Sequence, residues 1–185
     1  MEIVQPIRDK RMIELLKREL LKSGTRDYML FVFGINTGLR ISDILRMKVV
    51  DVKNKTHITF KEQKTKKVKK IKITTMLSTE LNDYMVDKDT TDFLFPSQKD
   101  SNDGSKKAIS RVQAYRILNK AARACSIEEI GTHSLRKTFG YHHYQLFKDV
   151  ALLQDIFNHS APSVTLRYIG LNQDCIDMSM DSFGL

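Results

Sequence analysis

The sequence RDYMLFVFGI, residues 26–35, contains the longest apolar run of the chain, which spans residues 28–35. A helix built from these residues is apolar on nearly every side. Such a helix is buried, because none of its faces is suited to water. We therefore predict a central core helix in this segment. The following Asn36-Thr37-Gly38 interrupts the helical pattern, and a second, short helix is expected from about Ile41.

The segments around the core helix predict a mainly α fold with a small antiparallel β-sheet, in the α+β class. Residues 11–22 place Ile13, Leu16 and Leu20 on one stripe, as in an amphipathic helix that ends at Ser23-Gly24. Residues 57–60 and 70–73 are typical of the two strands of a hairpin. Further helices are expected over residues 77–85, 110–125, 133–147, 149–157 and 162–171, and Val112, Leu118, Ala121 and Ala122 of the 110–125 helix are predicted core residues.

Length and charge limit the class of protein. The 185 residues favour one domain, and 31 Lys and Arg against 22 Asp and Glu leave a net charge of +9. This excess favours an anionic partner without distinguishing nucleic acid from a membrane surface. No apolar run approaches the ~20 residues that span a bilayer, and no export signal is found. Cys125 and Cys175 are the only cysteines, which fits reduced thiols in the cytosol.

Two basic features are candidates for nucleic-acid contact. Seven lysines lie along the predicted hairpin, where they can approach phosphates or can simply protect an exposed sheet edge. A second group lies at helical spacing in residues 110–125 and forms either a DNA-tracking stripe or an ordinary solvated face. The hairpin lysines are Lys61, Lys64, Lys66, Lys67, Lys69, Lys70 and Lys72, and the helical group is Arg116, Lys120 and Arg123.

Residues 37–45, TGLRISDIL, contain the first candidate site residues. Gly38 allows a tight turn, and Arg40 follows at the start of the short helix. Asp43 lies three residues later on the same helical face, where its carboxylate can hold the Arg40 guanidinium. The alternative is a glycine turn beside an exposed Arg–Asp pair of little energetic consequence.

Residues 131–137, GTHSLRK, form the second candidate. With Thr132 as the predicted N-cap, His133 and Arg136 can face one ligand from the first turn of a helix. The free N–H groups of that turn favour an anion. The alternative is a capped helix with a structural histidine.

Residues 157–168 form the third candidate, with His159 nine residues before Tyr168. A tyrosine, whose pKa is near 10, is a nucleophile only where positive groups and hydrogen bonds assist it. The alternative is a tyrosine packed on the core with its hydroxyl in water.

Taken together, the order of these motifs resembles the catalytic domain of the tyrosine recombinases, the phage-integrase family of DNA strand-exchange enzymes. The resemblance covers nearly the whole chain and is found in TGLRISDIL, EQKTKK (62–67), THSLRKTF (132–139) and FNHSAPSVTLRYIG (157–170). It implies that Tyr168 attacks a DNA phosphate and becomes linked to its 3′ side. Arg40 and Arg136 would clamp that phosphate.

The resemblance also implies the remaining roles. Lys64 would protonate the departing 5′ oxygen, although Lys66 or Lys67 takes this position if the register shifts. His133 would assist proton transfer, and His159 would bind a non-bridging oxygen. Asp43 stands at an acidic position of the family and would orient the arginine site. The predicted DNA-contact residues are Lys61, Lys66, Lys67, Lys69, Arg116, Lys120, Arg123 and Lys137.

The implied reaction needs neither a metal ion nor ATP, so no cofactor is expected. Double-stranded DNA is the expected partner, and no membrane partner is expected. The protein is expected to form a homo-oligomer, a tetramer, on DNA and to be a monomer in isolation. A bacterial or phage-encoded protein of this kind would act in the cytoplasm. Residues 1–185 are interpreted as one catalytic domain without the family's preceding DNA-binding domain. Asn158 replaces a common glycine, and the tail at 172–185 is a candidate for docking on another protomer.

Two other functions fit the same sequence. A type IB topoisomerase shares this chemistry, but the small size and the compact HSLRK spacing favour a recombinase. A DNA-binding accessory module without cleavage activity would not need the candidate nucleophile Tyr168.

Overall fold

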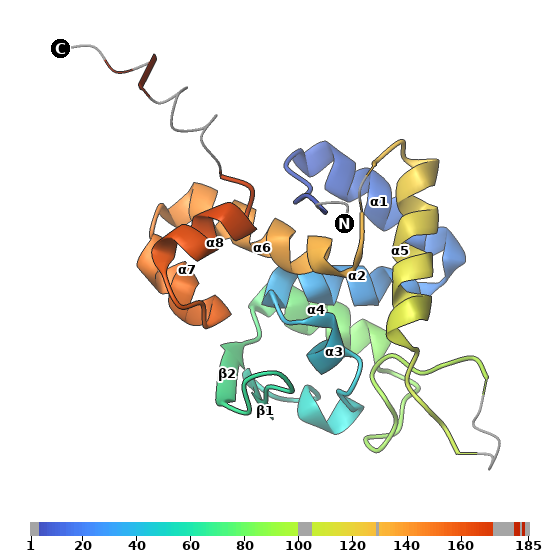
Figure 1. Ribbon diagram of the computed structural model, residues 1–185. Helices are drawn as coiled ribbons and strands as arrows, with labels where there is room; N and C mark the ends of the chain where they lie inside the picture. Colours follow the sequence, from blue (N-terminus) through green and yellow to red (C-terminus); the bar gives the residue numbers. More distant parts are fainter. Residues whose placement is uncertain (1–3, 100–104, 129, 172–179, 182, 184–185) are drawn as a thin grey trace.

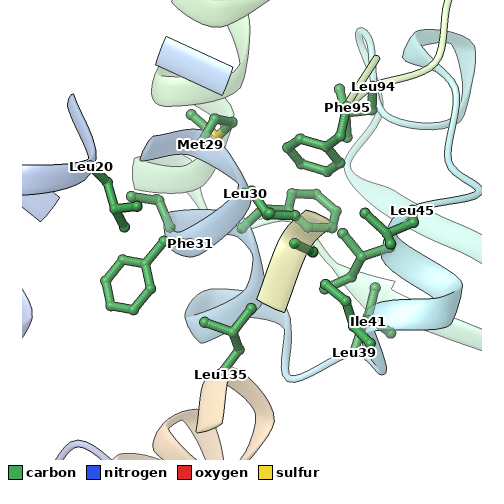
Figure 2. Packing of buried hydrophobic residues seen from close by; sticks show 14 of the residues in the cluster. Leu20, Met29, Leu30, Phe31, Leu39, Ile41, Leu45, Leu94, Phe95 and Leu135 are labelled. Carbon is green, nitrogen blue, oxygen red and sulfur yellow. The ribbon is translucent and has the colours of Figure 1, made fainter. Parts of the chain in front are cut away.

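The computed structural model describes residues 4–99, 105–128, 130–171, 180–181 and 183. Helices α1 (Lys10–Ser23) and α2 (Thr25–Thr37) pack against each other and are joined at Gly24. Helix α2 lies in the middle of the molecule, between α1, α4 and α6 (Figure 1). Leu30, Phe31 and Phe33 are completely buried, and Figure 2 shows the first two among other residues of the core. The predicted core helix is confirmed, and it extends slightly beyond the apolar run at both ends.

The predicted hairpin is also present. Strands β1 (His57–Lys61) and β2 (Val68–Lys72) pair antiparallel, with Ile58 opposite Ile71 and Phe60 opposite Lys69. Ile58 is buried while Val68 is exposed, so one face of the hairpin packs on the core and the other faces solvent. In the part of the chain that the structure describes, this is the only sheet, which confirms the α+β class.

The remaining elements surround α2 in two groups. Most of them bury their apolar faces in one large core. Helices α7 and α8 lie beside α6 (Figure 1) and close a smaller cluster of Leu153, Phe157 and Ile169. The site described below lies where the two clusters meet. These elements are α3 (Ile41–Ile44), a 3-10 turn (Val49–Asp51), α4 (Thr75–Tyr84), α5 (Arg111–Ala124), α6 (Thr132–Phe147), α7 (Val150–Phe157) and α8 (Pro162–Tyr168).

Three local predictions are wrong. Val112 is 58% exposed, and Ala114 takes the predicted core position on α5. Thr132 is the first residue of α6 rather than its N-cap, which is Gly131; the Gly131 N–H donates to the Ser134 hydroxyl. Helix α8 ends at Tyr168 and not at residue 171, because Gly170 turns the chain with a φ of 78°.

Other predictions can be located only in part. Cys125 is a half-buried free thiol, while Cys175 and most of the 172–185 tail lie outside the described residues. Among the helices that the structure describes, none is both long and apolar enough to cross a membrane.

Candidate active site

Arg136 is the centre of the candidate site. Its side chain is 5% exposed and donates from Nη1 to the Gly38 carbonyl at 2.7 Å and from Nη2 to the Phe157 carbonyl at 2.8 Å. The guanidinium also lies 4.2 Å from the centre of the Phe157 ring. Burial lowers the pKa of Arg136 to about 10, so the group remains charged at neutral pH. One buried cation therefore connects the α2–α3 turn, α6 and the end of α7.

Two glycines allow α6 to lie close enough to α2 for this contact. A Cβ added at Gly34 would lie 2.6 Å from Leu135, and one at Gly38 would lie 2.4 Å from Phe139. Gly38 in addition has a φ of 63°, in the left-handed region that favours glycine. The glycines thus form a groove on α2 that receives α6 and brings Arg136 to the α2–α3 turn.

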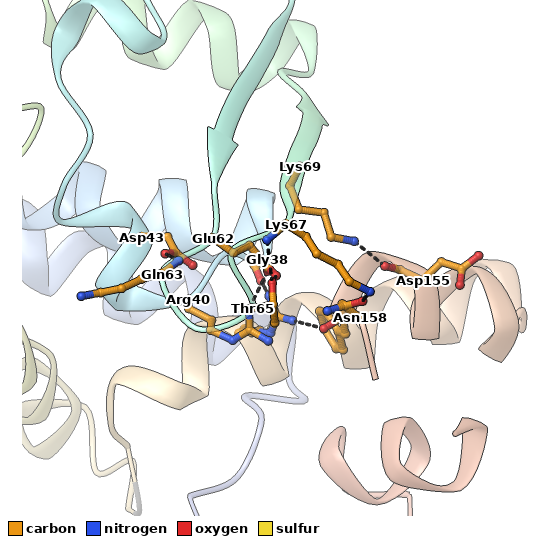
Figure 3. A network of polar contacts seen from close by, with 12 residues as sticks. Gly38, Arg40, Asp43, Glu62, Gln63, Thr65, Lys67, Lys69, Asp155 and Asn158 are labelled. Atoms are coloured by element: carbon orange, nitrogen blue, oxygen red, sulfur yellow. Dashed lines mark hydrogen bonds and ion pairs between the residues drawn. The ribbon is translucent and has the colours of Figure 1, made fainter. Parts of the chain in front are cut away.

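Arg40 lies at the N-terminus of α3 and pairs with a carboxylate that the sequence did not reveal. Its Nη1 lies 2.5 Å from Oε1 of Glu62, which is 2% exposed. The expected partner, Asp43, instead accepts the backbone N–H of Gln63 at 2.9 Å (Figure 3). The predicted contact between Arg40 and Asp43 is therefore corrected: Asp43 holds the hairpin turn. Glu62 was missed because it lies 22 residues from Arg40, beyond the reach of helical spacing.

Two of the seven hairpin lysines contact the end of α7, and the other five are exposed. Lys67 donates to Oδ1 of Asn158 at 3.3 Å and Lys69 to the Asp155 carbonyl at 2.7 Å, so both ammonium groups lie against the end of α7 (Figure 3). Lys61, Lys64 and Lys66 are exposed. The positive charge of Lys64 is the last of the causes that lower the pKa of His159, so the Lys64 ammonium lies within electrostatic range of that ring.

His159 follows the left-handed residue that ends α7. Asn158 has φ 53° and ψ 49°, a conformation that asparagine tolerates better than most residues, so it can replace glycine here. His159 Nδ1 and the buried Thr165 hydroxyl form a hydrogen bond of 3.0 Å. Burial, followed by the charges of Arg136, Arg40 and Lys64, lowers the pKa of His159 to about 4. The imidazole is consequently neutral at pH 7.

Tyr168 is the last residue of α8 and packs beside His159, with 5.1 Å between the two ring centres. Burial raises the pKa of its hydroxyl, although the nearby charges of Arg136 and Arg40 act in the opposite direction. The Lys137 ammonium lies 5.4 Å from the centre of the Tyr168 ring and donates to the Val4 carbonyl at 2.6 Å. Lys137, a predicted DNA contact, thus packs against the tyrosine.

His133 projects from the first turn of α6, where its ring is partly exposed. Its pKa is lowered by partial burial and by the charges of four neighbouring cations, among them Arg136 and Arg40. Arg116, Lys120 and Arg123 are exposed on α5. The structure therefore brings together Arg40, Lys64, His133, Arg136, His159 and Tyr168, from segments up to 128 residues apart along the chain, as 168 − 40 = 128.

Comparison with known proteins identifies the family of the chain. A model of the phage integrase family matches residues 5–174. A probable integrase/recombinase of Bacillus subtilis (strain 168), YoeC, is 53% identical over 184 residues, which cover 100% of this chain and 99% of that protein. The chain spans about half the length of some other relatives, such as the tyrosine recombinase XerA of Pyrococcus furiosus, of which 54% is covered at 27% identity.

Solved structures show the same fold. The catalytic domain of bacteriophage HP1 integrase superposes with a TM-score of 0.66 at 23% identity, covering 96% of this chain and 94% of that one. The XerH site-specific recombinase bound to its difH substrate superposes with a TM-score of 0.71 at 18% identity, covering 97% of this chain and 54% of that one. The family match and the shared fold lead to one conclusion: the chain belongs to the phage integrase family and is a tyrosine recombinase.

Proposed function

We propose that this protein cuts and rejoins DNA strands through a covalent bond between Tyr168 and a 3′ phosphate. The observation that carries the proposal is the position of Tyr168: its ring lies 5.1 Å from that of His159, and the charges of Arg136 and Arg40 act on its hydroxyl. A tyrosine that merely fills a core does not require two arginines and a histidine from distant segments around its hydroxyl.

The charges of the site suit attack on a phosphodiester. In-line attack increases the negative charge on the non-bridging oxygens, and guanidinium groups held in advance stabilise that charge. Arg136 is held by two backbone carbonyls and Arg40 by Glu62, so neither must reorganise when the phosphate arrives. The neutral His159 adds a donor: a Thr165 hydroxyl that donates to Nδ1 leaves the imidazole proton on Nε2, where it can bind a phosphate oxygen.

Proton transfer completes the reaction. The raised pKa of Tyr168 means that its hydroxyl must lose a proton to a base as the O–P bond forms. We assign this to His133, because its lowered pKa keeps it neutral and able to accept a proton. Lys64 donates a proton to the 5′ oxygen as the P–O5′ bond breaks. Arginines supply the positive charge without a metal ion, and the phosphotyrosine bond retains the energy needed for rejoining without ATP.

Double-stranded DNA is the proposed substrate. XerH was solved on its DNA site, and this chain shares its fold. The exposed Lys61 and Lys66, together with the α5 stripe of Arg116, Lys120 and Arg123, are proposed to contact phosphates and so give salt-dependent affinity. Exchange of strands between two duplexes requires four cleavages, so we expect a tetramer on DNA, formed from monomers, in the cytoplasm where the chromosome lies.

The decisive experiment looks for the covalent adduct. Purified protein is incubated with a pool of nicked duplexes that have a randomised core, in buffer with a chelator and without nucleotide. Adducts are separated under denaturing conditions and their DNA is sequenced. We expect an adduct with the wild type and none with Tyr168→Phe, because the phenylalanine has no nucleophile.

Tyr144→Phe is the matched control, since Tyr144 packs in the same small cluster and loses the same hydroxyl. It should still form the adduct. An adduct that persists in Tyr168→Phe would refute the assignment of the nucleophile. DNA binding by the wild type without an adduct on any substrate would favour the accessory-module function instead.

A further inference from the structure

Glu62 is a buried acid in a largely cationic site. Its side chain is 2% exposed, and both carboxylate oxygens are used. One accepts from Arg40 Nη1 at 2.5 Å, and the other accepts from the Thr65 hydroxyl (Figure 3). A buried carboxylate is costly unless it is paired and hydrogen-bonded, and removal of one partner leaves the other as an uncompensated charge.

The pairing holds Arg40 while leaving it able to bind a substrate. The Arg40 side chain is 18% exposed. Within the described residues, its only hydrogen bond to another side chain is the one from Nη1 to Glu62. Nη2 and Nε can therefore meet a phosphate in the paired geometry that guanidinium groups favour. The charge of Glu62 also acts on Arg136, where it partly offsets the lowering of the pKa by burial.

Glu62 also begins the turn that holds Lys64. Its N–H donates to the Lys67 carbonyl at 2.9 Å, and its own carbonyl accepts from the Lys66 N–H at 3.0 Å. Thr65 bonds to the Glu62 carboxylate, and Asp43 holds the neighbouring Gln63 N–H. The turn is thus attached to the Arg40 segment on both sides of Lys64, by Asp43 before it and by Glu62 through Thr65 after it.

We propose that Glu62 is a positioning residue that holds the Arg40 phosphate clamp and the Lys64 proton donor in one fixed arrangement. The inference rests on the proposed cleavage at Tyr168. Glu62 acts through Arg40 and through the turn, and it does not touch the reacting atoms. Its negative charge is what anchors Arg40, and its bond to Thr65 is what anchors the turn.

The test measures single-turnover cleavage by Glu62→Gln on two substrates. One is the ordinary DNA, and the other carries sulfur in place of the bridging 5′ oxygen at the cleavage site. A thiolate leaves without a donated proton, so this substrate removes the need for Lys64. On ordinary DNA we expect a loss of about 100-fold, the size that follows from a misplacement of about 1 Å. On the sulfur substrate the loss of rate should be smaller, because the part caused by the misplaced Lys64 no longer matters.

Arg40 is tested by combination. In an Arg40→Ala background, Glu62→Gln should reduce cleavage of the sulfur substrate by less than about 3-fold, because its remaining effect acts through Arg40. Glu80→Gln is the matched control: Glu80 accepts a hydrogen bond from Tyr28 away from the site, and this variant should cleave as the wild type does. DNA affinity at a fixed salt concentration should be retained in every variant.

Cleavage at the wild-type rate by Glu62→Gln would overturn the proposal. The proposal would also fail if Glu62→Gln lowered the cleavage rate as much in the Arg40→Ala background as it does in the wild type. If Glu62→Gln does not fold, Thr65→Val removes the turn anchor alone. This variant should cleave ordinary DNA more slowly than the wild type and the sulfur substrate at the wild-type rate. An equal loss of rate on both substrates would refute the link to Lys64. Absence of a Tyr168 adduct in the wild type would instead refute the proposed function itself.

Discussion

Replacement of Arg136 by alanine should reduce both stability and cleavage, for different reasons. The side chain donates to the Gly38 and Phe157 carbonyls in the protein interior. A buried polar group left without a partner costs about 1–3 kcal/mol, so two carbonyls amount to roughly 2–6 kcal/mol. The free energy of unfolding of a whole domain is only about 5–15 kcal/mol. Arg136→Ala is therefore expected to be folded at low temperature and clearly destabilised.

The effect on cleavage is separate. Loss of one donor that stabilises the transition state costs about 2.7–4 kcal/mol, or about 100- to 1,000-fold in rate. Non-specific DNA affinity should change little, because Arg136 is buried and meets only the one phosphate in the site. Arg136→Lys should also be impaired, since one ammonium group cannot bond to two carbonyls and a phosphate at once.

Urea denaturation gives the stability change, and single-turnover cleavage of a nicked duplex at 10 °C gives the rate. DNA affinity is measured at the same salt concentration. Unchanged stability would show that the two carbonyl bonds contribute nothing. DNA affinity that falls as far as the cleavage rate would make Arg136 a DNA anchor and not a group that acts in the transition state.

Two further predictions concern His159. Thr165→Val keeps the buried shape but removes the hydroxyl bonded to Nδ1, so cleavage should fall about 2- to 10-fold, as for the loss of one neutral hydrogen bond, with DNA affinity unchanged; a wild-type rate would exclude a role in orienting the imidazole. Because the folded pKa of His159 is about 4 and the unfolded value is near 6.5, the unfolded state binds more protons between these values, and stability should fall as pH decreases through this window. The thermal midpoint of the wild type should follow this trend and that of His159→Gln should follow it less steeply, whereas identical slopes would contradict the low pKa.

Much of the fold could be predicted from local patterns. The continuous apolar run at 28–35 identified α2, because a segment with no polar face has to be buried. The stripe of Ile13, Leu16 and Leu20 identified α1. The errors were at helix ends and at Val112, where an apolar residue lies on the solvent side of α5 and the small Ala114 fills the core position. Periodicity does not show which of two neighbouring faces meets another helix.

The sequence by itself determined the helices, the hairpin and the residue types of the site, because periodicity, turn residues and motif order are properties of neighbouring positions. Only the tertiary structure decided the partners: Arg40 pairs with Glu62 and not with Asp43, and Lys67 and Lys69 lie against α7 while Lys64 stays exposed. It also decided that the pKa of Tyr168 is raised and that of His159 lowered. Ion pairs and pKa values depend on distance and burial, and both arise only when remote segments pack together.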